Sequence, residues 1–195
     1  MLRRVVREDA HGGAAAVHSG RLALAMHDAR YIHVLKAAAV AEPVEVEVVI
    51  EVPRGSFLNR GSSGRIDFVS PLPCPFNYGA VPSHLGHEGD LLDALVLGPR
   101  LRLGNRARRM AWGAITLTDR GMSDDKLICC EHRPSADEIE RVLRFFHFYA
   151  KCKGLLNLWR RRPGRNACEG WCSASDAMAR ARPLPAEWSR APIPF

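Results

Sequence analysis

Three carboxylates fall within six residues of the chain, at Glu88, Asp90 and Asp93. The apolar run 94–97 follows at once and stops at Gly98-Pro99, which predicts a short buried strand with the carboxylates at its mouth. Clustered carboxylates stay ionised together when cations lie between them, and oxygen-only ligands suit Mg²⁺, Mn²⁺ or Ca²⁺. Taken alone, so short a stretch is more often a solvated acidic turn.

A second acidic cluster contains Asp119, Asp124 and Asp125, in a predicted loop over residues 119–125. The loop follows a predicted strand over 110–118, and another predicted strand comes directly after it. Both clusters therefore stand at strand ends, where the backbone is rigid enough to aim a side chain. We expect the two clusters to converge in space although they lie far apart in the sequence.

The elements that must position these carboxylates are mostly short strands. Residues 44–52 alternate between valine or isoleucine on one face and glutamate on the other, which predicts a half-buried strand that ends at Pro53. Further strands are predicted over 65–69 and 126–130, and residues 77–79 have the composition of a turn. Several short strands followed by helices favour a small barrel or curled sheet with the helices packed outside.

Two helices are predicted after the strands. Ser135 and Glu138 form a capping box, and apolar residues then recur at helical spacing as far as Tyr149. This helix is expected to end before Gly154, and a shorter one is expected over 173–182. A basic, helix-breaking connection that contains three consecutive arginines separates them, and such a run is usually a solvated surface.

Length and composition indicate one domain with a true core, since 47% of the 195 residues are hydrophobic. We expect an N-terminal extension over 1–42, a domain over 43–183 and an irregular, proline-rich tail over 184–195. The net charge of +7 favours polyanionic partners: nucleic acid, a membrane surface or small phosphorylated substrates.

The compartment is predicted from apolar runs and cysteines. The chain contains no apolar run long enough to span a bilayer, and charged residues interrupt the N-terminal segment, so neither a membrane partner nor a secretory signal is expected. Its six cysteines form no C-x-x-C pair, which predicts reduced thiols in a cytoplasmic protein.

Several stretches in the same order resemble the soluble family I inorganic pyrophosphatases, over about residues 44–171. Residues 88–96 resemble the family's D-G-D-P-x-D-x-L-V signature, and 50–53 resemble its I-E-[IV]-P strand. Residues 75–79 resemble its P-x-[ND]-Y-G turn, and 119–126 resemble its D-x-x-x-x-D-x-K loop. Residues 145–149 resemble the family's aromatic helix, which carries a tyrosine. No single piece would suffice, but the combination is specific.

The resemblance implies a mainly β fold with flanking α-helices, a five-stranded OB-like barrel followed by two C-terminal helices. It implies hydrolysis of inorganic pyrophosphate to two phosphates by a metal-activated water, with Mg²⁺ as the cofactor, Mn²⁺ as the alternative, and homo-oligomeric assembly. Asp90 would be the catalytic base. The implied metal ligands are Glu88, Asp90, Asp93, Asp119 and Asp124. The implied substrate-binding residues are Glu51, Lys126, Tyr149, Tyr78 and Arg65.

The chain departs from the family pattern mainly on the phosphate-binding side. Glu88 stands where the family has aspartate, and Tyr149 is followed by alanine rather than lysine, with Lys151 one residue late. The family's lysine and glutamate on the second strand have no clean counterpart, and Asn59 and Arg60 are the nearest candidates. These departures leave two alternatives open: a catalytically weakened barrel that binds nucleic acid through its basic surface, or a hydrolase of another phosphoanhydride.

Overall fold

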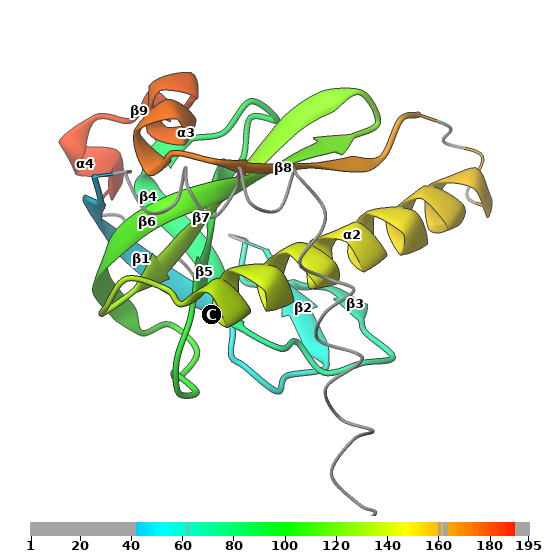
Figure 1. Cartoon of the computed structure of the whole chain (residues 1–195), viewed down its shortest axis with the longest axis horizontal. Coiled ribbons are helices and arrows are strands. Elements are labelled where there is room, and N and C mark those ends of the chain that lie inside the picture. The colour runs from blue at the N-terminus through cyan, green and yellow to red at the C-terminus, as the bar shows by residue number, and fades with distance from the viewer. Residues whose placement is uncertain (1–41, 62, 160, 162–163, 190–195) are drawn as a thin grey trace, which may run out of the picture. The chain divides into compact units, whose positions relative to one another are not determined.

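The structure, a computed structural model, describes residues 42–61, 63–159, 161 and 164–189. This described part is mostly β-sheet with three helices (Figure 1). In chain order the elements are β1 (Val44–Val52), β2 (Leu58–Arg60), β3 (Ile66–Val69), β4 (Asn77–Leu85), β5 (Leu91–Val96), β6 (Arg106–Asp119), β7 (Met122–Cys130), α2 (Ala136–Trp159), β8 (Ala167–Cys172), α3 (Ala174–Arg180), β9 (Arg182–Pro183) and α4 (Ala186–Ser189).

Five strands close into a barrel in the order β1-β4-β5-β7-β6, because β6 pairs with β1 as well as with β7. The pairing is antiparallel except between β5 and β7, which run parallel. Strand β8 extends the sheet beyond β6, and β9 pairs with β4. The expected five-stranded barrel is therefore confirmed. The predicted strand 65–69 lies outside it, because β3 pairs only with β2 in a separate two-stranded sheet.

The barrel interior is filled by one apolar side-chain set from all five strands. Val48 and Ile50 of β1 alternate inward as the valine pattern predicts, and both are fully buried. Alanines at 174, 177 and 181 join the same cluster, so α3 and the residue after it pack against one end of the barrel core. Their small side chains allow the helix backbone to approach the strands closely.

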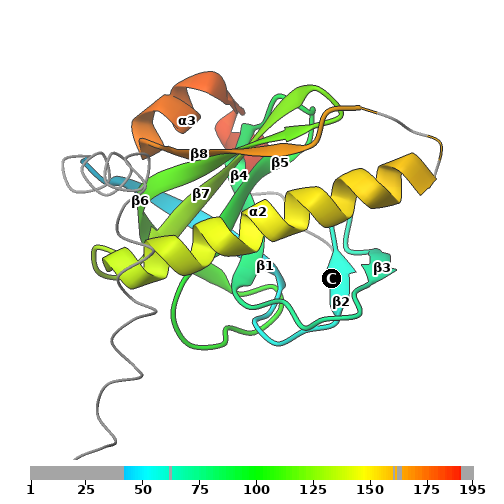
Figure 2. The ribbon, with the colours of Figure 1, turned by 45° about the vertical axis from the view of Figure 1, so that its right-hand side comes forward.

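Helix α2 packs on the outside of the barrel. Its buried residues Ile139, Val142 and Phe146 meet Ile115 and Ile128, which point outward from β6 and β7. In Figures 1 and 2 the helix crosses the barrel between β8 on one side and the β2–β3 hairpin on the other. The expected capping box begins it: the Ser135 amide donates to Glu138 Oε2 at 2.9 Å, and the Glu138 amide donates to Ser135 Oγ at 3.3 Å.

The helices differ from the prediction at their C-terminal ends. Helix α2 continues through Gly154 to Trp159, because Asn157 is buried and its Nδ2 donates to Asn166 Oδ1 at 3.2 Å. This packing overrides the low helix propensity of glycine. A third helix, α4, lies inside the tail that was expected to be irregular, so the described part has three helices after the barrel rather than two. Strand β8 was not predicted at all.

The expected turn at residues 77–79 is wrong, since these residues begin β4. Gly79 is needed there because β4 lies very close to β1: a Cβ atom on Gly79 would sit 2.0 Å from the carbonyl oxygen of Val49. The expected loop 119–125 is also wrong. Strand β6 runs to Asp119 and β7 starts at Met122, so only a two-residue turn joins them.

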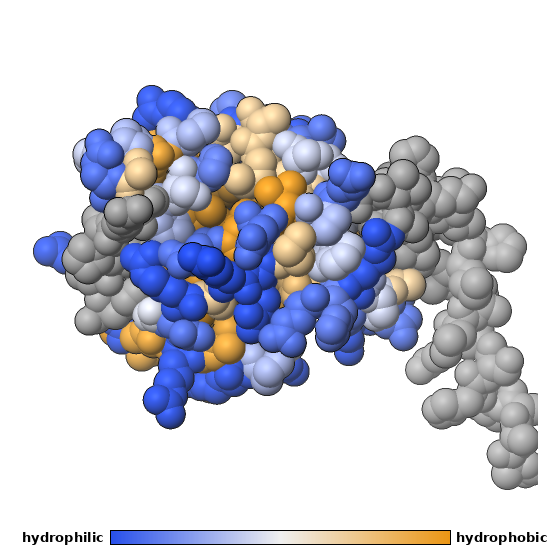
Figure 3. Space-filling view, turned by 90° about the vertical axis from the view of Figure 1, so that its left-hand side faces the viewer, coloured by the Kyte–Doolittle hydropathy of each residue, from blue (hydrophilic) through white to orange (hydrophobic). Residues whose placement is uncertain are grey.

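The predicted extension over 1–42 falls outside the described residues except for Glu42. Within the described part, none of the helices combines the length and apolar composition needed to cross a bilayer. On the side of the molecule that bears α3 and α4, hydrophilic side chains predominate and apolar ones show between them in small groups (Figure 3).

Candidate active site

A row of polar side chains crosses the outer face of the barrel beside α2. Tyr78, Asp93 and Lys126 come from β4, β5 and β7, and the parallel register pairs Asp93 directly with Lys126. Side chains two residues apart share a strand face, so Asp93 lies on the same face as the outward-pointing Leu95. The closed barrel thus brings these three together from separate strands.

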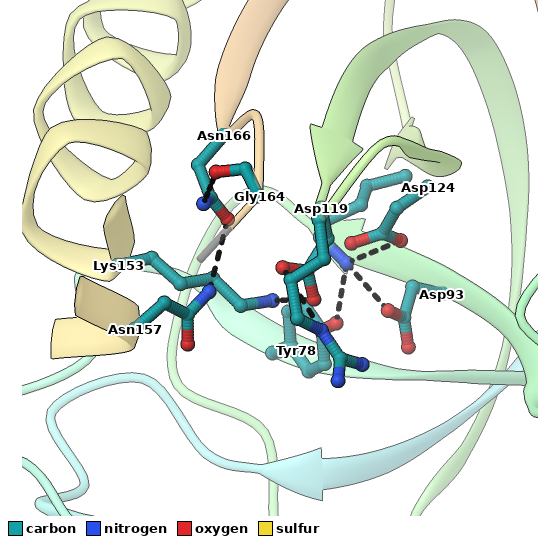
Figure 4. A network of polar contacts seen from close by, with 10 residues as sticks. Tyr78, Asp93, Asp119, Asp124, Lys153, Asn157, Gly164 and Asn166 are labelled. Carbon is teal, nitrogen blue, oxygen red and sulfur yellow. Dashed lines mark hydrogen bonds and ion pairs between the residues drawn. The ribbon is translucent and has the colours of Figure 1, made fainter. Parts of the chain in front are cut away.

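Lys126 is the centre of this row. Its Nζ atom lies 2.5 Å from Asp93 Oδ2, 2.9 Å from Asp124 Oδ1 and 3.0 Å from the Tyr78 hydroxyl (Figure 4). Burial alone would lower the pKa of Lys126, but Asp93, Tyr78 and Asp124 raise it well above its usual value. The lysine therefore stays charged and holds the two carboxylates together.

Asp119 and Asp124 are brought to this face by the β6–β7 hairpin. Arg120 (φ 49°) and Gly121 (φ 90°) occupy the two turn positions, and positive φ at both is what a tight hairpin turn requires. Leu117 then pairs with Asp124, so Asp119, two residues after Leu117, is on the same side of the hairpin. The predicted convergence of the two acidic clusters is seen for Asp93 and Asp124, which share Lys126.

Helix α2 adds a residue that sequence reasoning missed. Lys153 Nζ lies 2.7 Å from Asp119 Oδ2 and 5.7 Å from the centre of the Tyr149 ring. Tyr149 and Lys153 are one turn apart, so they lie on the same side of the helix. Figure 4 shows Lys153 extending from α2 toward Asp119. Because the helix was expected to end before Gly154, the one-turn spacing of Tyr149 and Lys153 was not recognised. Lys151, which lies between them in the sequence, is exposed.

A cavity of about 320 Å³ opens beside the row. Its lining includes seven carboxylate residues, namely Glu51, Asp67, Glu88, Asp90, Asp93, Asp124 and Asp125, all within the part of the chain that the structure describes. The one arginine or lysine among the described lining residues is Arg60, from the β2–β3 hairpin, and Asn59 lies beside it. Arg65 is not among them. The cavity is thus strongly acidic and would attract cations.

The electrostatics of the cavity show in Glu88. Partial burial of its carboxyl group, with the negative charges of Asp124 and Asp119, raises the pKa of Glu88 to about 7, against the opposing effect of Lys126 and Lys153. The pKa of Tyr78 is also raised well above its usual value, first by burial and then by Asp93. At Glu88, burial and the neighbouring carboxylates therefore outweigh the opposing effect of the two lysines.

Asp125 points to the other side of β7. Its Oδ2 accepts a hydrogen bond from Arg180 Nε of α3 at 2.7 Å, and Arg180 also donates to Cys172 Sγ at 3.2 Å. Asp125 is 8% exposed, so its charge is balanced by α3 rather than by solvent. Successive residues Asp124 and Asp125 therefore have separate partners, one on each face of the strand.

The donor set fits a hard divalent cation. Asp119 Oδ1 is buried and has no hydrogen-bond partner among the described residues. The side chains that surround Lys126 and Lys153 offer oxygen donors, which Mg²⁺ and similar ions prefer. No three of the described His, Cys, Asp and Glu side chains already converge on one point to hold an ion. The ammonium group of Lys126 lies between Asp93 and Asp124 instead, and that of Lys153 is paired with Asp119.

The comparisons with known proteins identify the family. The family model described as inorganic pyrophosphatase matches residues 48–159, which is more than half of the chain. The chain belongs to the inorganic pyrophosphatase family. Membership implies a divalent metal cofactor, in agreement with the oxygen donors of the cavity.

Individual relatives agree with this assignment. The inorganic pyrophosphatase of Gluconobacter oxydans is 28% identical over 155 residues, which cover 69% of this chain and 86% of that protein. The inorganic pyrophosphatase of Streptomyces coelicolor is 37% identical over 112 residues, which cover 53% of this chain and 67% of that protein. The crystal structure of the inorganic pyrophosphatase from Thermus thermophilus superposes with a TM-score of 0.59 at 25% identity, over 70% of this chain and 86% of that one.

Metal-free protein should become less stable as the pH rises through the range in which Glu88 ionises. Its pKa is 4.5 ordinarily and about 7 in the fold, so the folded state holds the proton more tightly. That contribution is complete below about pH 4.5 and is lost by about pH 7. Urea unfolding of Glu88→Gln and of the unmodified protein, in the presence of a chelator, measures this loss. We expect the stability of the variant relative to the unmodified protein to be greater at pH 8 than at pH 5. An equal difference in stability between the two proteins at both pH values would contradict the raised pKa.

Proposed function

We propose that the protein hydrolyses inorganic pyrophosphate to two phosphates with Mg²⁺ as its cofactor and Mn²⁺ as the alternative. The observation that carries this proposal is the row on the barrel face, where Asp93 and Asp124 flank Lys126 and Tyr78. Pyrophosphate is a compact polyanion, so its hydrolysis requires cations that neutralise its oxygens and a base for the attacking water. A cluster of carboxylates with lysines among them can bind or supply those cations, and one of the carboxylates can act as the base.

The residues that would hold the metal are Glu88, Asp90, Asp93, Asp119 and Asp124, since they offer oxygen donors around or beside one cavity. When bound, the metal supplies charge neutralisation and acidification of a water molecule. Asp90 lies on the exposed rim of the cavity, where its carboxylate can orient and deprotonate the attacking water.

The substrate would be held by the cationic and hydroxyl groups of the row. Lys126 and the Tyr78 hydroxyl are already adjacent, and both can donate to phosphate oxygens. Tyr149 borders the neighbouring cavity that Asp119 and Asp124 also line, and buried Glu51 lines the main cavity. For the arginine of the site we now propose Arg60 in place of Arg65, because Arg60 lines the cavity.

The decisive test is phosphate release from pyrophosphate by the purified full chain, with Mg²⁺, with Mn²⁺ and with a chelator. We expect release with either metal and none with the chelator. A nucleoside triphosphate tested in parallel addresses the alternative of another phosphoanhydride. Hydrolysis of the triphosphate alone would overturn the proposal.

The nucleic-acid alternative is less well supported by the cavity. Seven carboxylate residues line it, and they would repel a phosphodiester backbone. A filter-binding assay with single-stranded RNA, at low salt and in a chelator, should therefore show no tight complex.

We also propose a cytoplasmic location and homo-oligomeric assembly. All six cysteines are free thiols, which suits a reducing compartment. Exposed apolar side chains on α2, including Leu155 and Trp159 at 71% and 79% exposure, offer a surface for a second copy. Light scattering after size exclusion measures the assembly directly.

Glu88 is the main departure within the acidic signature, and we expect Glu88→Asp to lower turnover or Mg²⁺ affinity. The glutamate is one methylene longer than the family's aspartate, and the surrounding loop is expected to have adjusted to that length. Mg²⁺ demands near-ideal geometry, so a donor withdrawn by about 1 Å binds less well. The measurement is kcat as a function of Mg²⁺ concentration. A gain of about tenfold or more would show that Glu88 is a defect.

A further inference from the structure

Lys153 occupies a position on α2 where a helix normally places an apolar residue. The buried residues Phe146, Ala150 and Asn157 recur at helical spacing along one side of the helix, and Lys153 falls on the same stripe. Lys151, two residues earlier, points away and is exposed. The direction of Lys153 toward the site is therefore set by the period of the helix.

The side chain of Lys153 is partly buried. It is 29% exposed, and Nζ contacts Asp119 Oδ2 and lies over the Tyr149 ring. Lysine side chains ordinarily extend so that the ammonium group stays hydrated. Here the side chain instead turns toward the carboxylate cluster, although Lys126 already balances Asp93 and Asp124 there.

We propose that Lys153 is a substrate-binding residue of this site. In the metal-free protein its ammonium group is paired with Asp119 instead. The inference rests on the proposed function and deepens it. Asp119 is one of the proposed metal ligands, so a bound cation would compete with Lys153 for its carboxylate. The released ammonium group is then free to donate a charge-assisted hydrogen bond to a diphosphate oxygen.

The charge balance of the cavity gives this exchange a physical reason. The one arginine or lysine among the described lining residues of the cavity is Arg60. In the metal-free protein Lys126 is engaged with two carboxylates. A second cation that becomes available only when metal binds would couple substrate binding to metal loading. Empty protein would then offer the diphosphate few cations.

The test compares Lys153→Met with Lys151→Met, which removes the same charge from the exposed side of the same helix. Three quantities are measured: the Kd for Mn²⁺ alone, the Kd for methylenediphosphonate with Mn²⁺ present, and KM with kcat for pyrophosphate. For Lys153→Met we expect the diphosphonate Kd and the KM to rise about 10- to 100-fold, as for the loss of a hydrogen bond to a charged group. The Kd for Mn²⁺ alone should fall, because a competing cation has left Asp119. Lys151→Met should match the unmodified protein.

Unchanged diphosphonate binding by Lys153→Met would overturn the inference. Weaker binding of both Mn²⁺ and diphosphonate, with a lower urea midpoint, would also overturn it, since that combination indicates a purely structural lysine. If the unmodified protein neither binds the diphosphonate nor releases phosphate, the proposed function fails as well. An active unmodified protein with an indistinguishable Lys153→Met variant refutes only the role of Lys153.

Discussion

Replacing Asp93 with asparagine should lower kcat/KM for pyrophosphate by at least about 100-fold while the barrel stays folded. Asp93 is 26% exposed at its side chain and faces the cavity, so its charge is available to a metal ion. The amide keeps the size and one oxygen acceptor for Lys126, and Asp124 remains to balance that lysine. The loss should therefore appear in metal-dependent turnover rather than in the stability of the barrel.

The matched control is Asp137→Asn, which removes the same charge from the exposed first turn of α2. Its turnover should equal that of the unmodified protein. Asp119→Asn should behave like Asp93→Asn, and both should raise the Kd for Mn²⁺. Unmodified rates for Asp93→Asn at limiting Mg²⁺ would exclude Asp93 as a metal ligand.

The largest effect on stability is expected for Gly79→Ala, at about 3 kcal/mol or more of the free energy of unfolding. The added Cβ would lie 2.0 Å from the Val49 carbonyl oxygen and 3.0 Å from Ile50 Cα, both backbone atoms that no rotamer change can move. The two strands would have to separate next to Glu51 and Tyr78. Urea unfolding, monitored by tryptophan fluorescence and circular dichroism, measures the loss.

Gly86→Ala is the control for this substitution. The nearest atoms to a Cβ at Gly86 are 3.7 and 4.0 Å away, in ordinary contact. Its stability should remain within about 1 kcal/mol of the original, since alanine also restricts the unfolded chain. If Gly79→Ala unfolded at the same urea concentration as Gly86→Ala, β1 and β4 would be farther apart than the structure places them.

Much of the fold could be predicted because pattern and packing agree there. Residues 44–52 alternate except at Val49, and β1 has those bounds. The capping box of Ser135 and Glu138 fixes the start of α2. Prediction failed where a strand carries part of the candidate site: residues 119–125 are polar and suggest a loop, although Asp124 and Asp125 lie within β7. A strand face that holds an active site does not show the apolar alternation of a core strand.

The site itself was only partly predictable. The carboxylates and Lys126 were found because their types and spacing match a family signature. Lys153 was not, because Gly154 suggests a helix end, whereas α2 continues past it to the contact between Asn157 and Asn166. Arg60 could not be distinguished from Arg65 by spacing, since the β2–β3 hairpin decides which of the two faces the cavity.

The place of β7 in the barrel also has a consequence for folding. β7 is the last of the five barrel strands in the chain, yet it lies between β5 and β6, and its pairing with β5 is parallel. A parallel pair cannot form through a tight turn, so this contact is non-local and belongs among the slower steps of folding. Its arrival closes the barrel and, in the same event, sets Asp124 and Lys126 beside Asp93. A nascent chain that ends after β6 therefore has neither a closed barrel nor the lysine-bridged carboxylate pair.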